Sequence, residues 1–181
     1  MQSPGQSLTF GRMIADRRTS VAFTGHRTYR GAAADALRRT VGELYALGFR
    51  NFLSGMAVGF DLAAAEAVLE LRERMPGVRL VAAVPFRGQE MRFSPADRER
   101  FRCVLAEADS VEVLAPAYHR GCYAVRNDFL VDNARVLVAW YDGSPGGTRY
   151  TVRRALGRGL EVVNLCPAAP VPPAPAPTLF G

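Results

Sequence analysis

Three short turns that contain glycine carry the side chains best suited to chemistry. They read Thr24-Gly-His-Arg27, Ser54-Gly-Met-Ala-Val-Gly-Phe-Asp61 and Asp142-Gly-Ser-Pro-Gly-Gly-Thr148, and each follows a short apolar run. The second and third turns also precede segments of helical pattern. Glycine lets a ligand approach the backbone, and the unpaired N–H groups and the dipole at a helix start favour an anion. The turns therefore predict a cradle for the phosphate of a nucleotide-like ligand, with a plain tight connection as the alternative.

The polar residues of the turns fall into groups by the contact they offer. Backbone or hydroxyl contacts are expected from Gly25, Ser54, Gly55, Gly59, Gly146, Gly147 and Thr148. His26 and Arg27 suit an anion, although His26 also fits a hydrogen-bonded loop histidine. Asp61 is a candidate ligand contact that a role as helix N-cap would equally explain. Asp142 is typical of a turn residue that bonds its own backbone.

Six apolar runs alternate with segments of helical periodicity, and these elements must position the turns. The expected strands cover 21–23, 51–53, 79–86, 110–114, 136–139 and 160–165, the fourth being less buried. Helices are expected over 33–47, from 62, from 94, and over 122–134 and 148–156. This alternation predicts an α/β fold: a Rossmann-like, doubly wound, mainly parallel six-stranded sheet with helices on both faces. Ligands bind outside the carboxyl ends of such strands, where the three turns fall.

The helix over 122–134 adds a polar cluster, Arg126-Asn127-Asp128. Adjacent polar residues within a helix usually indicate a solvated face. Here the helix leads directly into the strand before the third turn, so its first half is placed to lie over that turn. We then expect Arg126 to neutralise a phosphate and Asn127 to hydrogen-bond a ribose or a base.

Composition limits the classes of function. The 181 residues suffice for one domain, no apolar run approaches the roughly 20 residues of a membrane span, and no signal-peptide pattern appears, so we expect a cytoplasmic protein. Three scattered cysteines and two histidines predict no metal site, and no cofactor is expected. The net charge is +6 and every basic side chain is Arg, which is weak evidence for nucleic acid. A homodimer is left open.

The two ends of the chain differ in composition from the rest. Residues 1–19 show little periodicity and are expected to form a flexible leader, followed by the domain over 20–166. Residues 167–181 are rich in proline and alanine and are expected to form a disordered tail.

Four motifs in order along the chain resemble one superfamily. Residues 54–67 (SGMAVGFDLAAAEA) are similar to the glycine turn of DprA/Smf and YpsA-like proteins. The TGHR (24–27), RND (126–128) and YDGSPGGTRYT (141–151) segments resemble the YpsA-like branch specifically. This superfamily, SLOG, joins DprA/Smf with the Lonely Guy (LOG) enzymes. The resemblance covers 21–165 and implies a Rossmann-like domain that binds a nucleotide or a nucleotide-derived, ADP-ribose-like ligand, with a sensor as one role for such a protein.

The resemblance to LOG enzymes also implies an alternative, phosphoribohydrolase activity on nucleoside 5′-monophosphates. LOG enzymes use an Arg from an Arg-Lys pair and a Glu just after their glycine turn. Arg126 matches that Arg, but Asn127 replaces the Lys, and Arg149, Tyr150 and Thr151 stand where the acid would be. Glycosidic cleavage needs a carboxylate near the oxocarbenium-like centre.

Among the carboxylates of other turns, Glu66 is the preferred substitute, with Asp61 and Asp142 as weaker candidates. The enzyme alternative therefore rests on Arg126 and Glu66. A second alternative is DprA-like binding of single-stranded DNA. The turn over 54–61 and the Arg excess favour it, while the sequence shows no obvious aromatic-rich stacking face.

Overall fold

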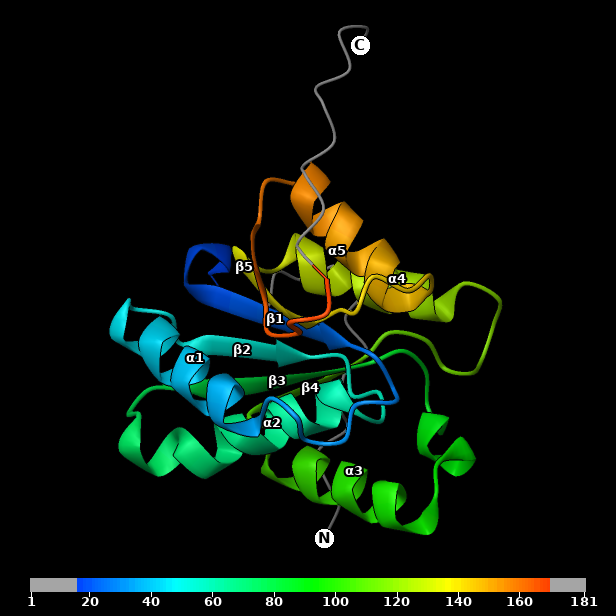
Figure 1. Cartoon of the computed structure of the whole chain (residues 1–181). Helices are drawn as coiled ribbons and strands as arrows, with labels where there is room; N and C mark the ends of the chain where they lie inside the picture. The colour runs from blue at the N-terminus through cyan, green and yellow to red at the C-terminus, as the bar shows by residue number, and fades with distance from the viewer. Residues whose placement is uncertain (1–15, 170–181) are drawn as a thin grey trace, which may run out of the picture.

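Six parallel strands form one sheet in the order β4-β3-β2-β1-β5-β6 in the computed structural model, which describes residues 16–169 (Figure 1). The strands are β1 (Ser20–Gly25), β2 (Asn51–Ser54), β3 (Arg79–Val84), β4 (Ser110–Val113), β5 (Val136–Trp140) and β6 (Glu161–Asn164). The helices are α1 (Ala34–Ala46), α2 (Phe60–Leu71), α3 (Pro95–Glu107), α4 (Cys122–Asp132) and α5 (Gly147–Gly157). Three short 3₁₀ helices are η1 (Arg17–Thr19), η2 (Arg72–Arg74) and η3 (Gln89–Arg92). The predicted Rossmann-like α/β fold is confirmed.

The helices cover both faces of the sheet. Helices α1, α2 and α3 lie on one face and α4 and α5 on the other (Figure 1). Successive strand residues point to opposite faces, so Val21 and Phe23 of β1 join the core beneath α1–α3, whereas Ala22 joins the core beneath α4 and α5. Both faces of the central strands are therefore buried, which explains their continuous apolar runs.

The sheet changes its winding direction at β1. Strand β1 pairs with β2 on one side and β5 on the other. Helix α1 connects β1 to β2 on one face, and α4 leads into β5 on the opposite face. The loops after β1 and β5 consequently separate at their shared edge. Such a topological switch point is where open α/β sheets bind ligands.

Local signals act as the sequence predicts. Ser94 caps α3 by accepting a hydrogen bond from the Asp97 N–H at 3.1 Å, and Pro95 occupies the first turn. Gly48, with φ of +96°, follows the end of α1. Strand β4, at the edge, is half-buried along its length, as expected.

The first described residues belong to the folded domain rather than to a leader. Asp16 caps η1 by accepting from the Arg18 N–H, and Arg17 Nε donates to the Ala134 carbonyl at 2.9 Å. At the other end Asn164 Nδ2 donates to the Ala169 carbonyl at 3.0 Å. The rest of the expected leader and tail, residues 1–15 and 170–181, lies outside the described residues.

Within 16–169 no helix combines the length and apolar character needed to cross a membrane.

Candidate functional site

A cavity of about 300 Å³ opens at the switch point, beyond the carboxyl ends of β1 and β5. All three glycine turns and α4 contribute to its wall. The lining residues are Thr24, Gly25, His26, Arg27, Ala57, Asp61, Tyr123, Arg126, Asn127, Gly147 and Thr148. Segments more than 100 positions apart in sequence therefore meet at one site, as the fold prediction required.

The structure gathers most of the predicted contact residues in this cavity. Eight of the predicted residues line the cavity: Gly25, His26, Arg27, Asp61, Arg126, Asn127, Gly147 and Thr148. The other predicted residues do not line it: Ser54, Gly55, Gly59, Gly146 and Glu66. Three lining residues escaped the sequence prediction, namely Thr24, Ala57 and Tyr123. A signal existed for Tyr123: it lies three and four positions before Arg126 and Asn127, so the three residues share one face of α4.

Arg126 is the buried cation of the site, with 6% of its surface exposed. Its Nε donates to Asn127 Oδ1 at 2.7 Å, and its Nη1 donates to the Gly55 carbonyl. Burial lowers the pKa of the guanidinium, while the charge of Asp61 opposes that shift. No hydrogen bond among the described residues uses Nη2. The Arg126-Asn127 pair is thus an inward-facing element of α4, not a solvated face, and Asn127 orients the arginine.

Asp61 provides the one carboxylate that lines the cavity. It lies in the first turn of α2, whose N-cap is Gly59, so the N-cap interpretation of Asp61 is wrong. Its Oδ2 lies 3.9 Å from Arg126 Nη1. The same oxygen accepts a hydrogen bond from the backbone N–H of Ala57, with 3.4 Å between oxygen and nitrogen. Burial raises the Asp61 pKa to about 6, partly offset by Arg126. Oδ1 is buried and has no hydrogen-bond partner among the described residues.

The turn between β2 and α2 is held by the protein's own hydrogen bonds. Ser54 Oγ donates to the Asp61 carbonyl at 2.9 Å and accepts from the Met56 N–H at 3.2 Å. Met56 has φ of +59°, and Gln89 Nε2 donates to its carbonyl at 3.0 Å. Ser54 is fully buried. The structure therefore gives Ser54 a role in shaping the turn rather than a place on the cavity wall.

Two glycines of this turn are required by internal packing. A Cβ on Gly55 would lie 2.7 Å from Arg126 Nη1 and 2.8 Å from Asp61 Oδ2. A Cβ on Gly59, which has φ of +86°, would lie 2.6 Å from the His26 carbonyl oxygen. The absence of a side chain thus lets Arg126 reach the turn and lets two turns pack together.

The start of α5 presents unpaired backbone donors to the cavity. Its N-cap is Gly146, with no side-chain capping bond, and no acidic residue stands in its first turn. The first four N–H groups of a helix have no partner within it. Gly147 and Thr148 line the cavity, and no described residue hydrogen-bonds the hydroxyl of Thr148 or of Thr24. These free donors, with Arg126, suit an anion.

His26 connects the first turn to the third. Its Nε2 lies 2.8 Å from Asp142 Oδ1 and 3.2 Å from the Asp142 backbone N. The same carboxylate oxygen accepts from Ser144 N at 2.9 Å and Ser144 Oγ at 2.6 Å, and these bonds hold the Asp142 pKa below its usual value. Both residues act as hydrogen-bonded loop residues, the interpretation the sequence allowed for each. Asp142 is not on the cavity wall.

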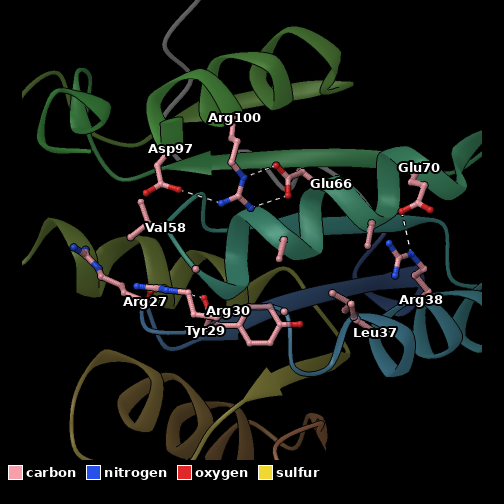
Figure 2. Close-up of a pocket in the computed structure, with 15 residues that line it drawn as sticks. Arg27, Tyr29, Arg30, Leu37, Arg38, Val58, Glu66, Glu70, Asp97 and Arg100 are labelled. Atoms are coloured by element: carbon pink, nitrogen blue, oxygen red, sulfur yellow. Dashed lines mark hydrogen bonds and ion pairs between the residues drawn. The ribbon is translucent and has the colours of Figure 1, made fainter. Parts of the chain in front are cut away.

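Glu66 lies in a second, larger cavity of about 690 Å³ between α1, α2 and α3 (Figure 2). Its two carboxylate oxygens each lie 2.7 Å from Arg100, which also contacts Asp97 at 3.1 Å. The Arg126–Glu66 catalytic pair suggested by the sequence is therefore wrong, because the two side chains line different cavities. The hypothesis failed because helical spacing identifies residues on one face of α2 but not which neighbour that face meets.

The two cavities differ in how their cations are paired, although Arg30 in the larger one forms no salt bridge with a described residue. In the larger one Arg38 pairs with Glu70 at 3.0 Å, and Arg100 is neutralised by Glu66 and Asp97 (Figure 2). Arg27 lines both cavities. Within residues 16–169 no group of three His, Cys, Asp or Glu side chains is placed to hold a metal ion.

The fold and site together define a Rossmann-like α/β domain whose candidate site is an anion-favouring cavity at the switch point. The model of the YspA SLOG family (YpsA) matches residues 22–159, more than half of the chain. The chain belongs to this family.

Curated relatives and solved structures agree with this membership. A UPF0398 protein of Bacillus thuringiensis (strain Al Hakam) is 29% identical over 132 residues, 71% of either chain. The X-ray structure of DNA processing protein A (DprA) from Streptococcus pneumoniae matches 79% of this chain with a TM-score of 0.58 and 20% identity. A DprA structure from Helicobacter pylori, titled for its single-stranded DNA binding mode, matches 79% with a TM-score of 0.54 and 17% identity. This chain spans 48% and 64% of those two DprA chains, and the likeness shows a shared fold.

Proposed function

We propose that this protein binds a nucleotide or nucleotide-derived ligand, with a phosphate held between the start of α5 and Arg126. One observation carries the proposal: the uncapped N-terminus of α5 and a buried arginine converge on one cavity at the switch point. The helix start offers aligned N–H donors, and the guanidinium offers charge in a site screened from solvent.

The rest of the wall suits the sugar of such a ligand. Thr24 and Thr148 bring hydroxyl groups, and Asp61 Oδ1 is an acceptor without a partner. Ribose hydroxyls both donate and accept, so they can satisfy these groups. Arg27 reaches both cavities, which gives a longer, ADP-ribose-like ligand a second cation beyond the first cavity.

A sensor role follows if the ligand is bound without being changed. The cavity holds no carboxylate on α5, where LOG-like hydrolysis would need one: Arg149 and Tyr150 occupy the first turn, and Thr151 is fully buried with its hydroxyl bonded to the Gly147 carbonyl. We therefore place binding ahead of hydrolysis.

The test is a thermal-shift and calorimetric panel of AMP, ADP-ribose, ribose 5-phosphate, adenosine and a thymidine oligonucleotide. A ligand that binds the native state raises its melting temperature. We expect shifts with the phosphate-bearing small molecules, none of similar size with adenosine, and loss of the shift in Arg126→Ala. Glu66→Gln, in the other cavity, is the matched control and should bind as the wild type does.

Two results would contradict the proposal. If adenosine and AMP bind with equal affinity, the phosphate does not contribute to binding. Retention of the oligonucleotide alone, weakening steeply with salt, would instead support the single-stranded DNA alternative. Because loss of Arg126 also leaves Asp61 without its neighbouring cation, the melting temperature of the free variant must be measured in parallel.

A further inference from the structure

Three aromatic rings from distant segments meet beside the cavity. Phe86 follows β3, Tyr118 lies in the loop before α4, and Tyr123 lies on α4 itself. The ring centroid of Phe86 lies 5.4 Å from that of Tyr118 and 5.9 Å from that of Tyr123, and the two tyrosine rings are 6.4 Å apart. Phe86 is buried, whereas Tyr118 is 52% exposed. The buried ring thus supports two tyrosines at the surface, a group we call the aromatic corner.

An arginine guanidinium lies over each tyrosine ring of the aromatic corner. The guanidinium of Arg27 lies over Tyr123, 5.3 Å from the ring centroid, and that of Arg92 lies over Tyr118 at 4.7 Å. Neither arginine forms a salt bridge with any described residue, so their charges are available to a ligand. Alternating rings and guanidinium planes form the kind of surface on which nucleobases stack.

The aromatic corner is continuous with the candidate phosphate site. Tyr123 lines the cavity together with Arg126 and Asn127, which follow it by three and four positions on the same face of α4. The ring of Tyr123 therefore shares one cavity wall with the start of α5. Nothing in the sequence indicated this cluster, because residues 86, 118 and 123 form no aromatic-rich segment.

We propose that the aromatic corner is the base subsite of the same ligand, with the rings of Tyr118 and Tyr123, tilted 57° to each other, contacting a nucleobase by face and by edge beside Arg27 and Arg92. This inference rests on the proposed function and narrows it. The ligand must carry a planar base linked through its sugar to the phosphate, so a base-free sugar phosphate is a poorer ligand. Stacking tolerates any base, and the corner accordingly selects for the presence of a base more than for its identity.

The test compares AMP with ribose 5-phosphate by calorimetry on the full chain. Stacking of one base contributes enough for AMP to bind roughly 5- to 150-fold more tightly. Tyr118→Ala should remove much of this preference and leave ribose 5-phosphate binding unchanged, and Tyr123→Ala should also weaken AMP binding. Tyr123→Phe, which keeps the ring, should retain the preference. Tyr118 is largely exposed, so its variant is expected to fold even if Tyr123→Ala does not.

The outcomes separate this inference from the function on which it rests. Binding of neither compound defeats the proposed function. Equal binding of both by the wild type, or an equal loss of both in Tyr118→Ala, overturns the base subsite while the phosphate site stands. Tight binding of a thymidine oligonucleotide without binding of AMP overturns both, and assigns the rings to a DNA surface.

Discussion

The sharpest test of the phosphate site removes one backbone donor at the start of α5. Gly147 is the first residue of α5, directly after the N-cap Gly146. Proline is well accommodated at a first helical position because the N–H it lacks has no partner within the helix. Gly146, with φ of +137° and ψ of −165°, is unchanged in this variant and adopts that conformation without a Cβ penalty. We therefore expect Gly147→Pro to fold and to lack one donor at the cavity.

The matched control is Gly147→Ala, which adds a side chain but keeps the N–H. A Cβ at this position would meet only Asn127 Nδ2, at an ordinary contact distance of 3.7 Å. Alanine is also the better helix former, so the free protein should melt no lower than the wild type. A weaker affinity of the proline variant than of the alanine variant then reports on the lost backbone donor together with the ring carbon that takes its place.

The size of the expected loss follows from the charge of the acceptor. A hydrogen bond to a charged group contributes about 1.5–3 kcal/mol, which corresponds to roughly 10- to 150-fold in the dissociation constant. Calorimetric titration with AMP measures this directly, and melting temperatures of the free variants establish that both are folded. Equal affinities of the proline and alanine variants would refute a phosphate at the start of α5.

Three further predictions follow from the same geometry. Burial raises the Asp61 pKa to about 6 from 3.8, so the folded state binds more protons than the unfolded state between these values. The free energy of unfolding therefore falls as the pH rises through this range. In urea unfolding, the wild type should lose about 3 kcal/mol of this free energy relative to Asp61→Asn between about pH 4 and pH 7. A difference between the two proteins that does not change with pH would argue against the raised pKa. Ser54→Ala removes two buried hydrogen bonds and should lower the free energy of unfolding by about 1–3 kcal/mol in chemical denaturation, an unchanged value disproving its role in the turn. AMP incubated with the protein should yield no free adenine by chromatography; turnover lost in Asp61→Asn but kept in Glu66→Gln would establish the hydrolase alternative.

The sheet was predictable because its signals are local and consistent. Each central strand is a short apolar run, and each helix repeats apolar residues at helical spacing, so element type and order follow from neighbours in sequence. The cavity was also predictable in outline, because parallel strands bring the three glycine turns to one edge. That topological rule joined residues near 25, 60 and 147 without any knowledge of their contacts.

Side-chain partners were not predictable, since they depend on how helices are rotated against the sheet. Asp61 and Glu66 lie on the same helix, yet α2 directs one toward Arg126 and the other toward Arg100 on α3. Likewise the short glycine turn gave no sign that Gly55 accommodates an arginine rather than a ligand. The five-residue spacing of Asp61 and Glu66 places them on different sides of α2, but the partner that each side chain meets depends on long-range contacts.

The position of Asp61 bears directly on the choice between binding and hydrolysis. Stabilising an oxocarbenium-like centre requires a carboxylate that stays ionised close to the sugar. Asp61 is the one carboxylate on the cavity wall, but its charge is disfavoured by burial and is already shared with Arg126, 3.9 Å away. A group so placed is better suited to accept a ribose hydroxyl than to stabilise a cation. Under the proposed function, the arginine that would hold the phosphate therefore also weakens the case for cleavage.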